Sequence, residues 1–132
     1  MQIGFTGTRN KITEKQFDEL WDAIQTLRDT LGVEMAHHGD CVGADATFHE
    51  ICQSLDIPIT IHPPIEDKLR AWKEGKVLLE ARTYLARNKT IVEASDQMFG
   101  VPYTTEETKG GTWYTINYAK KCKVPVQIIL PN

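Results

Sequence analysis

Short apolar runs alternate along this chain with longer stretches in which apolar residues recur every three or four positions. The runs at 2–6, 33–38, 57–61, 97–99 and 124–130 are typical of buried strands, because each is short and ends at a turn. The longer stretches have the spacing of helices that bury one face. Strands that alternate with helices predict a parallel sheet with helices on both faces.

The first helix is the clearest of these predictions. Thr13 and Gln16 form a capping-box pattern, and Gly32 supplies a stop. Between them apolar residues recur at spacings of three and four: Phe17, Leu20, Ile24, Leu27 and Leu31. Further helices are expected after the second strand, over 82–94 and over 112–121. The charged, mixed segment between Glu66 and Leu79 predicts an irregular excursion.

The fold class that follows is α/β, with a mostly parallel sheet of about five strands. At 132 residues the chain fits a single domain, 1–132, with one hydrophobic core. The net charge of −3 lacks the basic excess of duplex-binding proteins, so nucleic acid is an unfavoured partner. A small anion remains possible, because a few amides and one or two cations are enough to bind it.

The cysteines and the apolar runs bear on the compartment. Three cysteines without a CxxC pair cannot form a closed disulfide framework, which favours a reducing environment. No apolar stretch approaches the length of a membrane span, and the first residues lack the pattern of a signal peptide. We therefore expect a cytoplasmic protein without a membrane segment.

Ligands of open α/β sheets bind at the carboxyl ends of the strands, and three glycine-containing turns fall there in this sequence. The first contains Gly7, Thr8 and Arg9, directly after the first strand. Glycine allows the backbone to approach an anion closely, and the guanidinium of Arg9 pairs with phosphate or carboxylate. A tight turn with a solvated Arg9 explains the same residues.

The second turn contains Gly39 and Gly43 before a helix, where free N–H groups attract a negative group. Asp45 has two interpretations: it caps its own helix, or it binds a ribose hydroxyl or base edge. His37 and His38 suggest a metal at first sight. Adjacent residues on a strand point to opposite faces, however, so we expect no metal site there.

The third turn is a glycine pair, Gly110 and Gly111, directly before a helix. With Thr112 at the cap and Thr115 one turn later, this pattern is typical of a phosphate cradle. A plain capped helix explains Thr112 but not the two glycines. Trp72, Trp113 and Tyr114 are also aromatic candidates for stacking on bases, although an aromatic share of 8% makes packing the simpler explanation.

Four segments in this order resemble the SLOG superfamily of Rossmann-like nucleotide-binding domains, in particular its small stand-alone bacterial and phage members. They are GFTGTR at 4–9, HHGDCVGAD at 37–45, ARNKTIVEASD at 86–96 and GGTWYTINYAKK at 110–121. The resemblance implies a three-layer sandwich that binds a nucleotide or nucleotide-derived signal without a resident cofactor. It also implies a homo-oligomer. The ligand site that we predict comprises Gly7, Thr8, Arg9, Gly39, Gly43, Asp45, Arg87, Asn88, Gly110, Gly111, Thr112 and Thr115.

One departure from the superfamily bears on catalysis. The LOG-type phosphoribohydrolases carry a glutamate two residues after the Thr of their glycine motif, where this chain has Asn117, and their leading Pro is Lys109 here. Cleavage of an N-glycosidic bond needs a carboxylate, which Asn cannot supply. Ligand binding is therefore the primary hypothesis. A nucleotide N-glycosidase is the alternative, with Asp45, Glu80 or Glu106 as the acid.

Overall fold

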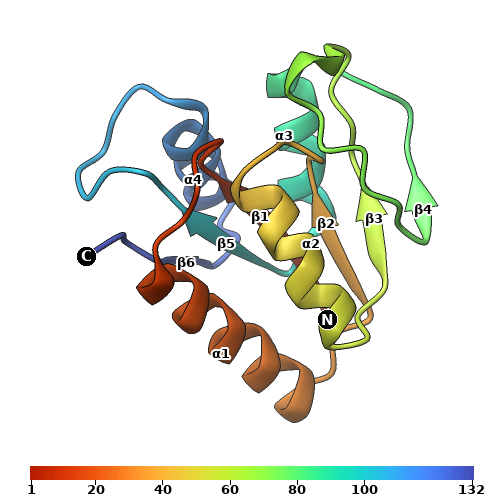
Figure 1. Ribbon diagram of the computed structural model, residues 1–132, viewed down its shortest axis with the longest axis vertical. Helices are drawn as coiled ribbons and strands as arrows, with labels where there is room; N and C mark the ends of the chain where they lie inside the picture. The colour runs from red at the N-terminus through yellow and green to blue at the C-terminus, as the bar shows by residue number, and fades with distance from the viewer.

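A six-stranded sheet forms the middle layer of the computed structural model, which describes residues 1–132 (Figure 1). All neighbouring strands pair in parallel, in the order β4-β3-β2-β1-β5-β6. The predicted α/β class and parallel sheet are therefore confirmed. The strands are β1 (Gln2–Gly7), β2 (Met35–His38), β3 (Ile59–Ile61), β4 (Val77–Leu78), β5 (Gln97–Val101) and β6 (Val126–Ile128).

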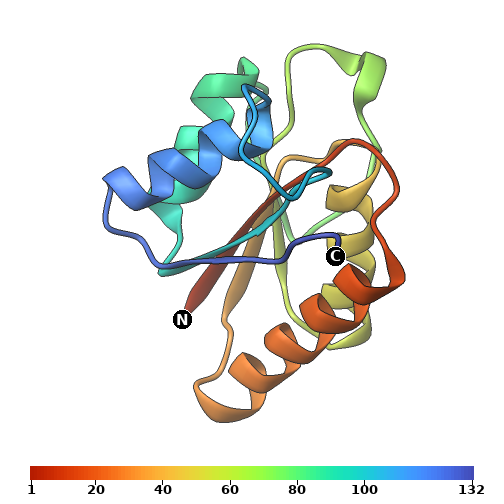
Figure 2. The ribbon, with the colours of Figure 1, turned by 90° about the vertical axis from the view of Figure 1, so that its left-hand side faces the viewer.

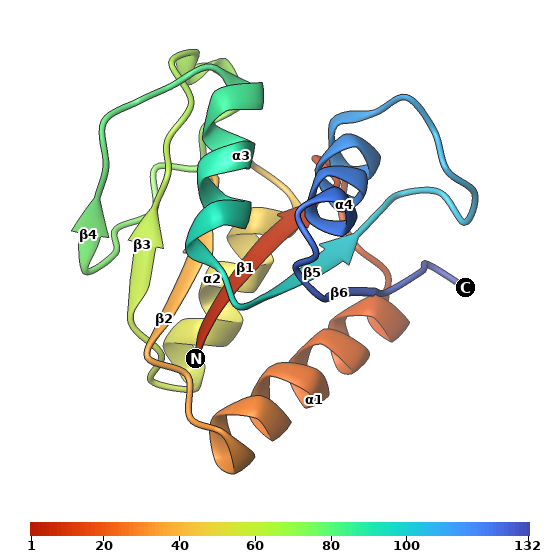
Figure 3. The ribbon, with the colours of Figure 1, turned by 180° about the vertical axis from the view of Figure 1, so that it is seen from behind.

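Helices cover both faces of the sheet, as predicted. α1 (Glu14–Thr30) and α2 (Ala44–Ser54) pack on one face, and α3 (Tyr84–Ala94) and α4 (Gly111–Lys121) pack on the other (Figure 2). Seen from behind, α3 and α4 lie side by side across the strands (Figure 3). A short 3-10 helix, η1 (Asp67–Leu69), lies between β3 and β4. None of the helices is long and apolar enough to span a lipid bilayer.

Strand β4 adds a sixth strand to the sheet of about five strands that we predicted. It falls in the segment that we expected to be irregular, and it pairs with β3 through Thr60 with Val77 and Ile61 with Leu78. Two residues are too few to give an alternating pattern, and both side chains are exposed. The strand is therefore defined by its pairing with β3, which the local sequence does not encode.

Helix α1 begins as its sequence predicts and then departs from it in one respect. Thr13 accepts from the backbone N–H of Gln16 at 3.1 Å, and Gln16 accepts from the backbone N–H of Thr13 at 3.0 Å. The Gln16 amide also donates to the Pro102 carbonyl at 2.8 Å, which ties α1 to the end of β5. Phe17 and Leu31, however, are 38% and 65% exposed, so the buried stripe is narrower than predicted.

The order of the strands places a crevice at the carboxyl end of β1. The chain runs outward from β1 through β2, β3 and β4, and then crosses back to add β5 and β6 on the other side of β1. At such a reversal the loops that follow the two central strands leave in opposite directions, which opens a ligand crevice. The main core beneath it includes Phe5 of β1, stacked on Phe48 of α2 with ring centroids 4.5 Å apart.

Candidate functional site

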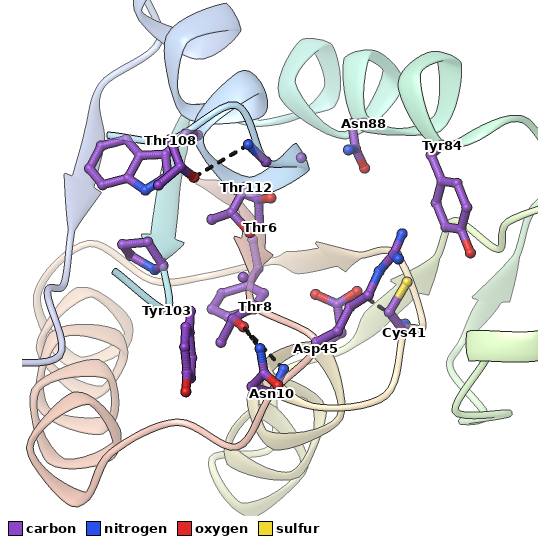
Figure 4. Close-up of a pocket in the computed structure, with 18 of the residues that line it drawn as sticks. Thr6, Thr8, Asn10, Cys41, Asp45, Tyr84, Asn88, Tyr103, Thr108 and Thr112 are labelled. Atoms are coloured by element: carbon purple, nitrogen blue, oxygen red, sulfur yellow. Dashed lines mark hydrogen bonds between the residues drawn. The ribbon is translucent and has the colours of Figure 1, made fainter. Parts of the chain in front are cut away.

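A cavity of about 420 Å³ opens at the carboxyl ends of β1, β2 and β5. Its walls come from the turn after β1, the loop before α2, the start of α3 and the segment from β5 to α4 (Figure 4). The fold thus brings segments from the whole length of the chain together, although ligand binding by them stays a prediction. Most of the predicted site residues line the cavity: Gly7, Thr8, Arg9, Gly39, Asp45, Arg87, Asn88, Gly110, Gly111 and Thr112.

Two predicted residues, Gly43 and Thr115, do not line the cavity. Gly43 precedes α2 with a φ of +89°, and a Cβ there would lie 2.4 Å from the carbonyl oxygen of Arg9. Glycine is therefore needed for close packing of two backbone segments. Thr115 is 1% exposed, and its hydroxyl donates to the Gly111 carbonyl at 3.0 Å. Its hydrogen bond therefore stays within α4.

Hydrogen bonds hold the turn after β1 in place, within the turn itself, to β5 and to α2. The Thr8 hydroxyl oxygen accepts from the backbone N–H of Asn10 at 3.0 Å and from its side-chain amide at 3.2 Å. The Thr8 N–H donates to the Val101 carbonyl of β5, and the Thr8 carbonyl accepts from the Ala44 N–H of α2, both at 2.9 Å. Arg9 extends from this fixed turn as an exposed side chain on the cavity wall.

The second arginine of the site, Arg87, is a buried cation without a salt bridge. It is 4% exposed, and its guanidinium donates to the carbonyls of Gly39 and His62, the latter at 3.2 Å. It also donates to the Asn88 side chain at 2.7 Å and to the Cys41 sulfur at 3.7 Å. None of these partners carries a full negative charge. A buried cation that borders a cavity and forms no salt bridge is suited to an anionic ligand.

The Tyr84 ring joins the two arginines. The guanidinium carbons of Arg9 and Arg87 lie 4.8 and 5.3 Å from the ring centroid. The Tyr84 hydroxyl is buried and has no hydrogen-bond partner, which is rare because an unpaired buried polar group costs free energy. Figure 4 shows Tyr84 on the opposite side of the cavity from Tyr103. Tyr84 thus lines the cavity and carries a buried hydroxyl without a hydrogen-bond partner.

Helix α4 begins at the cavity with two glycines and without a side-chain cap. Gly110 is the N-cap residue, so Thr112, which we predicted as the cap, is instead the second residue of the helix. A Cβ at Gly111 would meet no atom within 4 Å, which shows open space beside this end. The first N–H groups of a helix lack intrahelical partners and carry its positive dipole end, so they attract an anion.

Asp45 is the buried acid of the cavity. It is 6% exposed, and its carboxylate accepts from the Cys41 N–H at 3.1 Å. Burial raises the pKa of this carboxyl to about 6, although the nearby Arg87 guanidinium acts in the opposite direction. At neutral pH the Asp45 carboxyl is therefore mostly ionised. A carboxyl whose pKa lies near neutral pH exchanges protons readily.

The other candidate acids lie away from the cavity. Glu80 is exposed and borders a second cavity of about 200 Å³ instead. Glu106 is exposed and is not part of the cavity wall. Asn117, at the position where the phosphoribohydrolases carry glutamate, is exposed and donates to Glu107 at 2.7 Å. Asp45 is thus the one candidate acid that the fold places at the cavity.

Several wall residues were not predicted as ligand contacts: Asn10, Cys41, Tyr84, Pro102, Thr104 and Thr108. One signal was present for Tyr84. Thr83 caps α3 by accepting from the Ala86 N–H at 3.4 Å, and a threonine before a helical stretch marks the first turn of a helix. Trp113, which we considered for stacking on bases, also borders the cavity, as does Tyr103.

All four histidines of the chain are buried, and they form two pairs on opposite faces of β2. His37 shares a hydrogen bond of 2.9 Å with His62, and His38 shares one of 2.9 Å with His49. His37 and His38 therefore point away from each other, as the strand geometry predicts. The Asp40 N–H donates to Nδ1 of His38 at 2.9 Å, so the other ring nitrogen of His38 donates to His49.

We expect acid to destabilise the fold through these histidines. Burial lowers the pKa of all four, and that of His62 falls from 6.5 to about 4. Below pH 6.5 the unfolded chain therefore binds more protons than the folded one, so the free energy of unfolding decreases as the pH is lowered. The raised pKa of Asp45 acts in the opposite sense but is a single group. Between pH 7 and pH 5 the free energy of unfolding is expected to fall by about 2 kcal/mol.

Urea unfolding monitored at pH 7, 6 and 5 measures this change. The His62→Gln variant is the comparison, because it removes the histidine whose pKa is lowered to about 4 while keeping a polar side chain. Its pH dependence is expected to be shallower than that of the natural chain. A midpoint that stays constant from pH 7 to pH 5 in the natural chain would contradict the expectation.

The fold and the cavity together define a class: an α/β protein with a ligand-sized cavity at the switch point of a parallel sheet. No protein-family model and no curated protein matches this sequence. Solved structures do match it, and they share its fold across most of their length.

One such structure is the molybdenum cofactor binding protein of the phototrophic bacterium Rippkaea orientalis. It superposes with a TM-score of 0.75 at 16% identity, over 99% of this chain and 77% of that one. The molybdenum cofactor carrier protein of Chlamydomonas reinhardtii gives 0.67 at 18%, over 96% and 74%. A second structure of that carrier gives 0.68 at 18%, over 97% and 75%. These similarities show that the chain has the Rossmann-like α/β fold.

Proposed function

We propose that this chain binds a nucleotide or a nucleotide-derived small molecule, through a phosphate group, in the cavity at the end of β1. The observation that carries the proposal is the convergence of the uncapped start of α4 with the guanidinium groups of Arg9 and Arg87 on one cavity. These groups supply positive charge and N–H donors. The wall has no comparable set of anionic groups, Asp45 being its only acid.

Two further observations support the proposal. The cavity volume of about 420 Å³ lies in the range of small-molecule sites. Two proteins of the same fold, from Rippkaea orientalis and Chlamydomonas reinhardtii, bind or carry the molybdenum cofactor, so the fold accommodates small-molecule ligands in those proteins. Together with the resemblance to the SLOG superfamily, this favours a phosphorylated small molecule over a macromolecular partner.

Calorimetric titration tests the proposal. The panel comprises nucleoside monophosphates, NAD, ADP-ribose, cyclic nucleotides and the molybdenum cofactor, and each phosphorylated nucleoside is compared with the same nucleoside without phosphate. We expect at least one member to bind and the phosphate to strengthen binding about tenfold or more, because charge-assisted hydrogen bonds are the strong ones. No heat from any member would count against the proposal.

The Tyr84 hydroxyl gives a finer prediction. If a ligand supplies the partner that this buried hydroxyl lacks, Tyr84→Phe weakens binding by about fivefold to tenfold, since one neutral hydrogen bond is lost. The same change is expected to leave the stability of the free protein unchanged or slightly raised. Tyr114→Phe is the matched control, because Tyr114 is 41% exposed and does not border the cavity. Equal affinities for both variants would show that the Tyr84 hydroxyl does not contact the ligand.

A second function, N-glycosidic cleavage of a nucleoside monophosphate, rests on Asp45. It is the acid of the cavity, and its raised pKa suits general acid–base catalysis. Chromatography after long incubation of the protein with nucleoside monophosphates decides between binding and cleavage. Release of free base in proportion to the protein, and its loss in Asp45→Asn, would favour the enzyme. Binding without release would favour the first function.

A further inference from the structure

Strand β4 forms one edge of the sheet, and its apolar side chains are open to solvent. Val77, Leu78 and the following Leu79 are 38%, 63% and 38% exposed. The opposite edge differs, because Val126 and Ile128 of β6 are half-buried. An exposed apolar strand edge is a template for pairing with another strand, and proteins usually shield it.

The free edge presents the backbone groups of Leu78. The Leu79 N–H donates to the Ile61 carbonyl of β3 at 3.0 Å. Because backbone groups alternate in direction along a strand, the N–H and C=O of Leu78 point away from β3. Figures 1 and 3 show β4 as the outermost element on its side of the molecule, with nothing beyond it. These groups are therefore available to a strand from outside.

The sequence around Leu78 is complementary to its own reverse. Residues 76–80 read Lys-Val-Leu-Leu-Glu. When two copies pair in antiparallel fashion about Leu78, Lys76 of one copy lies opposite Glu80 of the other, and Val77 lies opposite Leu79. Leu78 lies opposite its own counterpart. The arrangement places two pairs of opposite charge around an apolar centre, and such cross-strand pairs stabilise a sheet.

Two observations favour this register over others. Lys76 and Glu80 are exposed and form no salt bridge within the chain, so both charges are free for a second copy. A two-fold axis at Val77 would place Glu74 opposite Glu80, and one at Leu79 would place Lys76 opposite Arg82, so both alternatives set like charges against each other. Leu78 is the residue of the exposed apolar run whose backbone faces outward.

We propose that two copies of this chain pair through β4, as antiparallel edge strands about a two-fold axis at Leu78. The contact is isologous, so each copy supplies the same surface, and it joins the two sheets into one. The pairing buries the exposed leucines and satisfies the outward backbone groups of Leu78. It does not depend on what the cavity binds.

Charge exchange tests the proposal by sedimentation velocity over a range of protein concentrations. We expect the natural chain to dimerise, and Lys76→Glu or Glu80→Lys alone to raise the dimer dissociation constant about tenfold, because each places like charges opposite each other twice. The double variant with both changes is expected to restore dimerisation. A monomeric natural chain, or a double variant no better than the single ones, would overturn the proposal.

Cross-linking tests the register. In a Cys122→Ser background, which removes the exposed cysteine, Leu78→Cys is expected to form a disulfide-linked dimer on mild oxidation. Opposed residues of a hydrogen-bonded antiparallel pair have Cα atoms about 5.5 Å apart, within disulfide range. Val77→Cys is the matched control, since this position lies opposite Leu79 rather than itself. Equal cross-linking at both positions, or none at Leu78, would contradict the register.

Discussion

Replacing Arg9 by alanine is expected to weaken ligand binding by about 1.5 to 3 kcal/mol, or about 10- to 150-fold, which is the range for hydrogen bonds to charged groups. The Arg9 side chain is exposed and borders the cavity. Its guanidinium lies over the ring face of Tyr84 and forms no hydrogen bond or salt bridge in the chain. The free protein loses little by its removal. The free energy of unfolding is expected to change by less than about 0.5 kcal/mol.

Lys11→Ala is the matched control for this experiment. Lys11 is a cation two residues further along, exposed, and outside the cavity wall. Calorimetry with the best-binding member of the nucleotide panel measures both variants. Similar affinities for Arg9→Ala and Lys11→Ala would show that general positive charge, rather than a contact from Arg9, attracts the ligand.

Arg87→Ala is expected to have the larger effect on the fold. The guanidinium of Arg87 satisfies the carbonyls of Gly39 and His62, which lie in a buried region. Its removal leaves both without a donor and opens a void, at an expected cost of about 2 to 4 kcal/mol in the free energy of unfolding. Arg87→Lys keeps the charge but not the planar fork of donors, so it is expected to recover only part of this loss.

Arg82→Ala serves as the control, because Arg82 is exposed and its side chain forms no hydrogen bond or salt bridge in the chain. Urea unfolding curves compare the three variants with the natural chain. If Arg87→Ala proved as stable as Arg82→Ala, the guanidinium would not hold the loop between β2 and α2 in place. Its role would then be confined to the ligand.

The sequence predicted the elements that carry strong local signals. The capping box at Thr13 and Gln16 is present, and the strands that alternate with helices form the parallel sheet. The turns at Gly7 and at Gly110 converge on one cavity because the carboxyl ends of parallel strands share an edge. These features depend on periodicity and turn chemistry, which are determined by residues close together in the sequence.

The features that were missed depend on contacts between distant residues. Gly43 has the pattern of an anion-binding glycine, but its role is set by the backbone of Arg9, which lies far away in sequence. The hydrogen bond between His37 and His62 likewise joins β2 to the residue after β3, and it has no local signature. Tyr84 reaches the cavity only because α3 begins there. Each of these features depends on tertiary packing, which local sequence patterns do not predict.

The most direct test of the proposed function is where a ligand binds. Amide NMR spectra recorded during titration with adenosine monophosphate and with ADP-ribose locate the contact residue by residue. We expect the largest shifts at the amides of Thr8, Gly110 and Gly111, with little change along β4. Spectra that stay unchanged with both compounds, or shifts confined to surfaces away from these three amides, would contradict it.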